Sequence, residues 1–492
     1  MMKSRFSCPL LLCLVLLFSA QQLPATPVNV DSALRVASAR LALLPGSSRF
    51  QIKEITAFTD AQLRLYICRT TPGGYLVVSG DTELPPVVAF SLDNDFGEIS
   101  VKRNPLLSLL VADLQLRWDN LELLPAETRN ERLQQWEQLL TGSPGEQDER
   151  PEDWWPPAGS TPTGGWIETN WTQSHPYNAF CPIDQESGNR SFAGCPSVAM
   201  AQILNFHRNI NSTRLNDWDD YHHNYAGNNF WIDDDYEEYQ FPSFPMLNGY
   251  LDSLEAHWDH ELPLTIDDKA ALVFACGVAC QQVYNPAGSG TFGVIQAYNA
   301  FLRFNHPEVR LLDEDDADLY TSMMQNMMDA LPVHFAIVTP QWDMGHNVVV
   351  DGYNSDDYYH LNFGWGGSFN GWYLLPDEIP YGLTVVEGAI CDIGCEPEVV
   401  WESPIQIAAW ELRCYPNPCN PVTAICFRLD KADNIALSIY DLQGRLVWKL
   451  AAGTLGAGEH TIRWEPAVAS GLYFARLSNG TFFEVAKVCV LR

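Results

Sequence analysis

One stretch near the middle of the chain decides the fold; it reads SFAGCPSVAMAQILNF from Ser191 to Phe206. After Gly194 the residues are strong helix formers and are apolar on nearly every face, which is typical of a buried helix. Pro196 suits the first turn of a helix, where its fixed φ helps and its missing N–H costs nothing. The sequence therefore predicts a buried helix whose first residue is Cys195.

A cysteine at a helix N-terminus can act as a nucleophile. Aligned peptide dipoles favour the thiolate there and lower the pKa of a thiol from about 8.5. Backbone N–H groups of the same turn can also hold an oxyanion. The alternative is a buried and inert cysteine, which is the usual fate of a lone Cys. This segment alone leaves both interpretations of Cys195 open.

A second region supplies a candidate general base. Residues 344–353 read MGHNVVVDGY, which places His346 after a glycine at the head of a predicted strand. Residues 358–367, YYHLNFGWGG, predict an adjacent strand, so Asn362 should lie beside the imidazole and fix its tautomer. His346 follows Cys195 by 151 residues (346 − 195), and Asn362 follows His346 by 16 (362 − 346). The order Cys, His, Asn at this separation is papain-like; the alternative is two polar residues at strand ends.

The central block of the chain, about residues 165–385, resembles the streptopain family, a branch of the papain-like cysteine peptidases. Three segments carry the resemblance, and their order and spacing agree together. They are NWTQSHPYN at 170–178, the helical segment at 194–207 and the strand region at 345–372. The resemblance implies a papain-like peptidase domain over residues 165–395.

The same resemblance assigns roles to individual side chains. It implies that Cys195 is the nucleophile and that His346 is the general base. Gln173 would donate its amide to the oxyanion, beside the Cys195 backbone N–H. Asn362 and Trp365 would orient and shield the His346 imidazole.

Three further positions bear on the resemblance. Ser289, in the loop PAGSG at 286–290, falls in a loop that resembles a wall of the family's substrate cleft. The family usually has a small aliphatic residue where Pro196 stands, and a Trp where Phe363 stands. Pro196 is harmless at a helix start, and Phe363 keeps an aromatic shield at its position.

The block before the peptidase segment, residues 26–141, has the pattern of a small α+β domain. Its helical and strand-like segments fall at residues 30–43, 63–67, 74–81, 106–116 and 126–140. The stretches GYLVVSGD at 74–81 and PPVVAFS at 85–91 resemble the pro-segment of the same family. That resemblance implies a domain that blocks the active site until it is removed.

Residues 142–164 are predicted to form an exposed linker. They combine Pro, Gly and acidic residues and offer little that could be buried, so the backbone should be easily cut. We expect the precursor to be processed between Gly142 and Gly165.

The last block, residues 405–492, reads as short strands separated by turns, which favours an immunoglobulin-like β-sandwich. The predicted strands are 424–429, 436–440, 446–448, 460–464, 472–477 and 482–491. The motifs YPNPCNP at 415–421, YDLQGR at 440–445 and SGLYF at 470–474 resemble C-terminal sorting domains of bacteria with type IX secretion. Cys419 replaces the usual Phe. An immunoglobulin-like module without a sorting role is the alternative.

The start of the chain and its charge limit where it acts. Residues 1–25 begin with basic side chains and continue with a short apolar run, a pattern typical of a secretory signal and too short to span a membrane. The 61 acidic residues outnumber the 29 Lys and Arg, and the formal net charge is −32. This acidity argues against nucleic acid and anionic membranes as partners. We expect an exported protein without a membrane span.

Cysteine usage points to a reactive thiol rather than to a metal. Of 13 cysteines, two leave with the predicted signal, and the remaining eleven (13 − 2) are an odd number, so at least one is unpaired. The pairs Cys276 with Cys280 and Cys391 with Cys395 lack zinc-ligand spacing and a matching second pair. No metal site is predicted.

The sequence thus predicts an α+β precursor: a papain-like cysteine endopeptidase with an inhibitory α+β pro-domain before it and a β-sandwich after it. The streptopain resemblance implies protein or peptide substrates with an apolar residue before the cleaved one, and the pro-domain as an intramolecular inhibitor. The sorting resemblance implies a bacterial secretion machinery as partner and a secreted or cell-surface location. No metal or organic cofactor is implied.

Three other functions stay open at this point. A surface binding protein could keep the papain-like shape without turnover. An amidase or acyltransferase could use the same nucleophile. An inhibitor protein could be built from the first block alone, although the complete central block argues against it.

Overall fold

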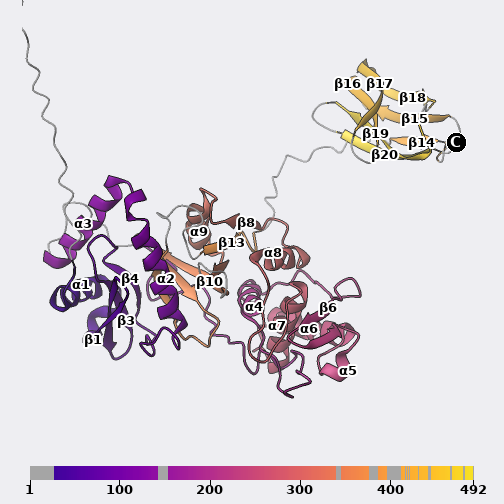
Figure 1. Ribbon diagram of the computed structural model, residues 1–492. Helices are drawn as coiled ribbons and strands as arrows, with labels where there is room; N and C mark the ends of the chain where they lie inside the picture. Colours follow the sequence, from indigo (N-terminus) through magenta and orange to yellow (C-terminus); the bar gives the residue numbers. More distant parts are fainter. Residues whose placement is uncertain are drawn as a thin grey trace, which may run out of the picture. The chain divides into compact units, whose positions relative to one another are not determined.

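The computed structural model describes residues 27–141, 153–338, 345–375 and 386–395, and most residues from 410 to 490. The predicted signal at 1–25 and residues 142–152 of the predicted linker lie outside these ranges. The chain divides into two compact units, Met1–Pro397 and Glu398–Arg492. Figure 1 shows the elements of both units.

One antiparallel sheet of eleven strands runs through the described part of the first unit. Its order is β1-β2-β3-β4-β12-β11-β10-β9-β13-β8, and β5 pairs with β10. The strands are β1 Gln51–Asp60, β2 Leu63–Thr71, β3 Tyr75–Ser79, β4 Val87–Ser91, β5 Trp154–Trp155, β8 Arg310–Asp313, β9 Val333–Val338, β10 Gly345–Asn354, β11 Tyr358–Asn362, β12 Gly371–Leu374 and β13 Val386–Cys391. The sheet therefore contains strands from both the first and the central block.

The N-terminal part of the sheet carries helices on both faces. These helices are α1 Val30–Leu43, α2 Pro105–Asp119 and α3 Ala126–Thr141. Side chains alternate along β3, so Leu76 packs with α1 and α3 while Val77 packs with α2. Burial on both faces explains why this strand is a continuous apolar run. The helices predicted at 30–43, 106–116 and 126–140 are confirmed, with small changes at their ends.

The two parts of the sheet meet at β4 and β12. Phe90 pairs with Trp372 across these strands, and their rings stack with centroids 6.3 Å apart. The fully buried Arg117 of α2 bonds to the Leu374 carbonyl at 2.8 Å. It also pairs with Asp113 at 2.8 Å. The N-terminal part is thus joined to the central part by backbone pairing and by a shared core.

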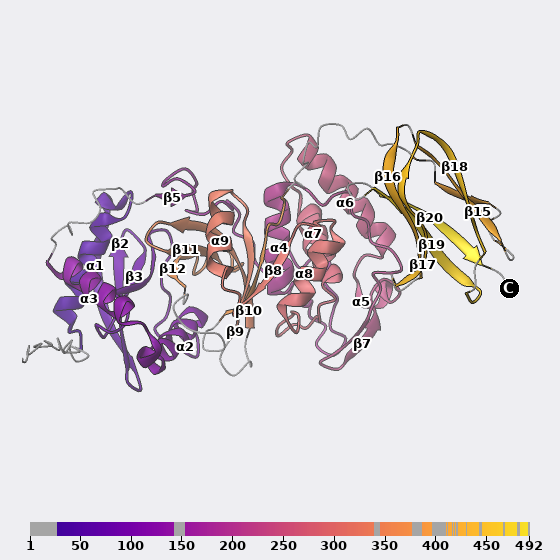
Figure 2. The same ribbon diagram turned by 90° about the horizontal axis from the view of Figure 1, so that it is seen from above.

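In the central part, most helices lie on the side of β8, β9 and β10 that faces away from the N-terminal part, as Figure 2 shows. They are α4 Cys195–His207, α5 Tyr236–Tyr239, α6 Phe244–Asp259, α7 Ile266–Ala279 and α8 Val294–Arg303, while α9 Leu319–Met328 precedes β9. A short hairpin, β6 His222–Tyr225 and β7 Asn228–Trp231, lies between α4 and α5 in the chain. α4 is packed by α7, α8, β9 and β10, and the predicted buried helix is confirmed.

The second half of the predicted linker differs from the expectation of an exposed segment. Trp154 and Trp155 form β5, which pairs with Asn354 and Tyr353 of β10. The Trp154 ring also contacts the Trp372 ring edge-on at 4.6 Å. Two large aromatic side chains provide enough apolar area to hold this stretch against the sheet. Residues 157–160 are exposed, as predicted.

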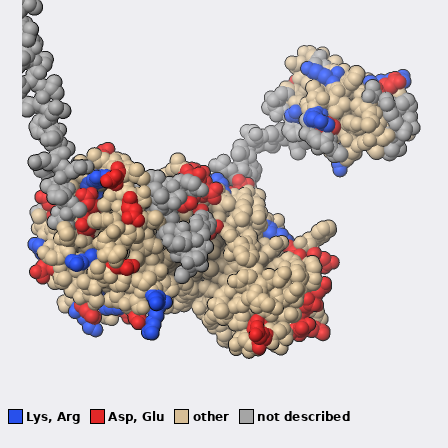
Figure 3. Space-filling view, in the orientation of Figure 1, with Lys and Arg blue, Asp and Glu red and all other residues tan. Residues whose placement is uncertain are grey.

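Acidic side chains gather over the region of α5 and β6, as Figure 3 shows. Partial burial and the neighbouring carboxylates of Asp234 and Asp233 raise the pKa of Asp220 to about 6. A surface of this charge repels other anions at short range.

The second unit consists of two antiparallel sheets, β14-β15-β18 and β17-β16-β19-β20. The strands are β14 Arg413–Tyr415, β15 Thr423–Leu429, β16 Asp433–Tyr440, β17 Leu446–Leu455, β18 Gly458–Trp464, β19 Gly471–Ser478 and β20 Phe483–Val490. Buried residues alternate along β15, and Ile425 and Phe427 share one core with Leu437 and Leu477 of the other sheet. The predicted strands are confirmed; β14 was missed and β17 is longer than predicted. Immunoglobulin-like topology stays a prediction.

Candidate active site

Cys195 is the first residue of α4, as predicted. Gly194 precedes it with φ of +87°, and a β-carbon there would lie 2.5 Å from the Gln282 Oε1. Only glycine fits this left-handed position without strain. Gln282 Nε2 donates to the Ala193 carbonyl at 2.6 Å and holds the same turn from behind. The turn therefore presents Cys195 at a fixed place at the N-terminus of the helix.

The sulfur of Cys195 lies against the start of β10. The side-chain amide Nδ2 of Asn347 is 3.8 Å from Cys195 Sγ. Asn347 directly follows His346, so the predicted nucleophile and the predicted base lie at one junction of α4 and β10. Between Cys195 and His346 themselves, both of which the structure describes, no direct hydrogen bond is formed.

His346 is held by groups from the loop after β11. Its Nε2 is 2.9 Å from the Phe363 carbonyl oxygen. A carbonyl oxygen only accepts, so Nε2 carries the proton and Nδ1 keeps a lone pair. The Trp365 ring stacks on the imidazole with centroids 4.2 Å apart and planes at 23°, and Phe363 stacks at 5.9 Å. The imidazole is therefore fixed in tautomer and in plane.

Asn362 does not contact the imidazole, contrary to the expectation. The register of the sheet pairs Asn362 with Val349, three residues along β10 from His346. Its Nδ2 donates to the Thr169 carbonyl at 2.9 Å, and its Oδ1 accepts from Gly364 N–H at 3.1 Å. Asn362 therefore holds the loop that carries the Phe363 carbonyl, and this carbonyl contacts the imidazole in its place.

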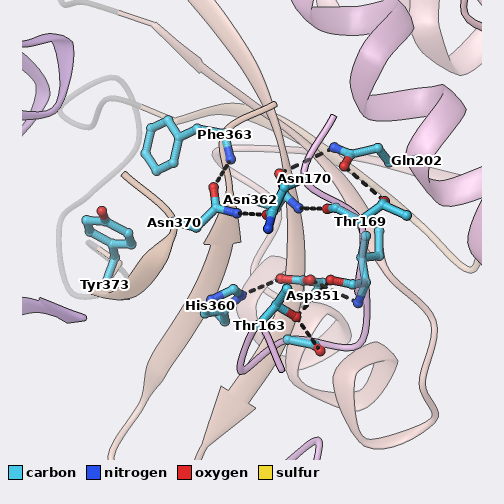
Figure 4. Close-up of polar contacts among 12 residues, drawn as sticks. Thr163, Thr169, Asn170, Gln202, Asp351, His360, Asn362, Phe363, Asn370 and Tyr373 are labelled. Atoms are coloured by element: carbon cyan, nitrogen blue, oxygen red, sulfur yellow. Dashed lines mark hydrogen bonds and ion pairs between the residues drawn. The ribbon is translucent and has the colours of Figure 1, made fainter. Parts of the chain in front are cut away.

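A network of buried amides surrounds Asn362, as Figure 4 shows. Gln202 of α4 donates to Asn362 Oδ1 at 3.3 Å and accepts from Trp171 N–H at 3.1 Å. Asn370 accepts from Phe363 N–H at 2.9 Å and donates to the Asn170 side chain at 3.0 Å. Sequence reasoning missed Gln202 and Asn370. The signal for Gln202 was a polar residue in an otherwise apolar helix, since buried amides need partners.

Gln173 and Ser289 lie on the two segments that flank the Gly194 turn. The Gln173 carbonyl accepts from Ala193 N–H at 2.9 Å, and its side chain is partly exposed. Ser289 bonds within its own loop, accepting from Asn285 N–H at 2.9 Å. The Asn285 carbonyl in turn accepts from Phe192 N–H at 3.3 Å. Gln173 is thus close in the backbone to Cys195, and Ser289 shapes a neighbouring loop.

The protonation of the two central groups differs from the expected thiolate. Removal from water raises the pKa of the Cys195 thiol, and hydrogen bonds from Asn347 act against that shift. Burial lowers the pKa of His346 to about 4, while the Phe363 carbonyl acts in the opposite direction. Desolvation penalises the charged form of both groups. In this full-length form, both the Cys195 thiol and the His346 imidazole are therefore neutral at neutral pH.

Alkylation should report this neutral pair. A raised thiol pKa leaves little thiolate at pH 7, so iodoacetamide should modify Cys195 of the full-length chain more slowly than the same cysteine in urea. The rate should rise about tenfold per pH unit below the pKa. Mass analysis of the Cys195 peptide measures it. A rate that is already flat between pH 5 and 7 would show an ion pair and contradict the expectation.

Comparisons with known proteins follow the same division of the chain. Residues 171–373 match the model of the peptidase C10 family. The central part of the chain is therefore similar to the peptidase C10 family. Residues 25–117 match the Spi protease inhibitor family, and residues 413–491 match the secretion system C-terminal sorting domain. The streptopain and sorting-domain resemblances are confirmed.

Several relatives of this C10 domain are named cysteine peptidases. Streptopain of Streptococcus pyogenes is 23% identical over 346 residues, which cover 66% of this chain and 77% of that protein. The thiol protease/hemagglutinin PrtT of Porphyromonas gingivalis is 27% identical over 220 residues, 42% of this chain and 23% of that protein. A fragment of Prevotella intermedia prointerpain A aligns with 70% of this chain and 99% of its own, at 17% identity and a TM-score of 0.47.

The family matches and the curated relatives set the general function of the chain. It is a cysteine protease made as a zymogen, with an inhibitor-like pro-domain. Its sorting domain marks it as a secreted or cell-surface protein. Among the residues that the structure describes, no helix is both long and apolar enough to cross a membrane.

Proposed function

We propose that the C10 domain is an endopeptidase in which Cys195 is the nucleophile and His346 the general base. One observation carries this proposal: Asn347, the residue after His346, contacts the Cys195 sulfur at 3.8 Å. The contact brings the start of α4 to the start of β10. The His346 Nδ1, freed by the bond of Nε2 to Phe363, is the nitrogen that would accept the thiol proton.

Each step of peptide hydrolysis then has a candidate group. His346 takes the proton of Cys195, and the thiolate attacks the peptide carbonyl. The Gln173 amide and the Cys195 backbone N–H would hold the tetrahedral oxyanion. His346 then protonates the leaving amine, and water hydrolyses the acyl-enzyme by the same route in reverse. Trp365 shields the imidazole, and Asn362 holds the loop that orients it.

Maturation would separate the pro-domain, residues 26–141, from the peptidase domain, residues 165–395. Cleavage is proposed between Gly142 and Gly165, where residues 157–160 are exposed. The C-terminal unit, residues 405–492, would deliver the precursor to a secretion machinery. The raised pKa of Cys195 and the lowered pKa of His346 in the full-length form support a latent precursor, since both shifts disfavour the charged pair.

The substrate proposed for this site is an extended peptide with an apolar residue before the cleaved one. The streptopain likeness supports this preference, and Ser289 would shape one wall of the cleft. A silent binding protein and an amidase or acyltransferase are the other candidates. The neutral Cys195 of the full-length form would also suit a binding protein, so both need a direct test.

Two measurements on the processed protein separate these functions. A peptidyl inhibitor that reacts with active-site thiols should label wild-type protein but not a Cys195→Ala variant. Casein should be cut at internal bonds by wild type only. Labelling without cleavage of casein would favour an amidase or acyltransferase, and the absence of labelling would favour the binding protein.

A further inference from the structure

Two polar side chains in sequence reach the Cys195 sulfur: the partly buried Asn347 and, next to it, the buried His334. Asn347 Nδ2 lies 3.8 Å from Cys195 Sγ, and Asn347 Oδ1 lies 2.8 Å from His334 Nε2. His334 is fully buried. Neither Asn347 nor His334 belongs to the set of residues that the sequence motifs singled out.

The register of the sheet explains why these groups meet. His334 of β9 pairs with Val349 of β10, and Asn347 is two residues away on the same face. Ala336 and Val349, on that face, share one core with Val198 of α4. Asn347 therefore points toward α4 at the level of its first residue, while its neighbour His346 belongs to the other face of the sheet.

In the structure, the oxygen of the Asn347 amide lies toward His334 and its nitrogen lies toward Cys195. The Asn347 Oδ1 can only accept, so the His334 Nε2 must carry the proton. Its Nδ1 is buried without a partner among the described residues, and the edge of the Phe301 ring lies against this imidazole. Burial lowers the pKa of His334 to about 4, so the ring stays neutral in this pocket. With Oδ1 turned to His334, the NH₂ group faces the sulfur.

We propose that Asn347 is a further catalytic residue, whose side-chain amide donates a hydrogen bond to the Cys195 sulfur and stabilises its thiolate, and that His334 is the positioning residue for this amide. The proposal rests on the proposed function of Cys195 as the nucleophile.

The contact has the chemistry that such a role needs. A hydrogen bond to a charged acceptor is about twice as strong as one between neutral groups, so the amide favours the thiolate over the thiol. The Asn347 backbone contributes in the same direction, and both oppose the effect of burial on the Cys195 pKa. A pre-oriented amide needs no reorganisation when the charge forms.

The other titratable groups around Cys195 leave a pH range in which the effect of Asn347 on the pKa of the Cys195 thiol can be measured. His334 and His346 have pKa values lowered to about 4, and burial raises the pKa of Cys280, the residue that caps α7, to about 12. Between pH 6 and 10 the two imidazoles and the Cys280 thiol therefore stay neutral. A change in reactivity in this range reports the thiol of Cys195.

The test is the pH profile of Cys195 alkylation by iodoacetamide in the full-length chain, read by mass analysis of the Cys195 peptide. Asn347→Ala removes the donor, and the isosteric Asn347→Asp replaces it with an acceptor. We expect the apparent pKa to rise by about one unit in Asn347→Ala, which lowers the rate at pH 8 about tenfold. Asn347→Asp should show a larger rise, and His334→Leu a smaller one in the same direction.

Val349→Ala is the matched control, because Val349 is fully buried on the same face of β10 and its apolar side chain cannot form a hydrogen bond to Asn347 or His334. It should lower thermal stability but leave the profile unchanged. Equal profiles for wild type and both Asn347 variants would overturn the proposal, and an unchanged His334→Leu profile would overturn the role of His334. Alkylation reports the sulfur and not hydrolysis, so a failure of the peptidase assignment leaves this result readable.

Discussion

Replacing His346 by alanine is expected to lower kcat/KM of the mature peptidase by about a thousandfold, within the range for loss of a general base. The imidazole would no longer accept the thiol proton, so the thiolate that attacks the peptide carbonyl would not be generated by a neighbouring base. The full-length variant should also fail to trim itself. Hydrolysis of a fluorogenic peptide, after processing in trans by tagged wild-type protein that is then removed, measures the loss.

His306→Ala is the matched control for this variant. His306 is another buried histidine with a lowered pKa, and it lies at the end of α8 near Asn211. We expect its kcat/KM to equal that of wild type once the folded fraction is taken into account. If His346→Ala kept about a tenth of wild-type activity or more, the imidazole would not be the base.

The second large effect is expected on stability, from Asp351→Ala. Asp351 is fully buried; its carboxylate lies 2.6 Å from His360 Nδ1 and accepts from Ile167 N–H at 3.1 Å. A side chain at Gly165 would collide with this carboxylate, so the backbone at the start of the peptidase domain packs directly against it. Removing one partner of such a buried pair costs about 3–5 kcal/mol in the free energy of unfolding.

Urea unfolding of the full-length chain measures this loss, with Cys195→Ala in the background to prevent self-cleavage. Asp351→Asn keeps the shape and part of the hydrogen bonding, so it should lose less. The exposed Asp315→Ala should change the free energy of unfolding by no more than about 0.5 kcal/mol. A loss for Asp351→Ala as small as that of Asp315→Ala would show that the carboxylate is not needed to hold Ile167.

The sequence predicted the parts of the site that depend on local pattern. Helix propensity and Pro196 located the start of α4 at Cys195, and the Gly-rich aromatic run located Trp365 beside His346. The predicted contact of Asn362 with the His346 imidazole was wrong because it depends on strand register, which places Asn362 opposite Val349. Asn347 was read only as a residue of a predicted strand, and nothing local indicates that it faces a sulfur 152 residues away.

The architecture shows the same division between local and long-range information. In the N-terminal part, β2 and β3 were predicted from their own alternation or apolar run, whereas β1 was not predicted. The pairing of β4 with β12 could not be predicted in this way, since it joins Phe90 to Trp372, which are 282 residues apart in the chain (372 − 90). The strand at Trp154–Trp155 was hidden within a Pro- and Gly-rich stretch, where composition outweighed two aromatic residues.

The pairing of β4 with β12 has a consequence for the enzyme after maturation. When the N-terminal part leaves, Gly371–Leu374 loses its neighbour and becomes the border of the remaining sheet. Its backbone groups and the Trp372 and Tyr373 rings, buried in the full-length form, then face solvent. Such a border readily templates the addition of a foreign strand. Removal of the N-terminal part would therefore leave β12 as an unpaired edge strand, which could pair with an edge strand of another copy of the chain.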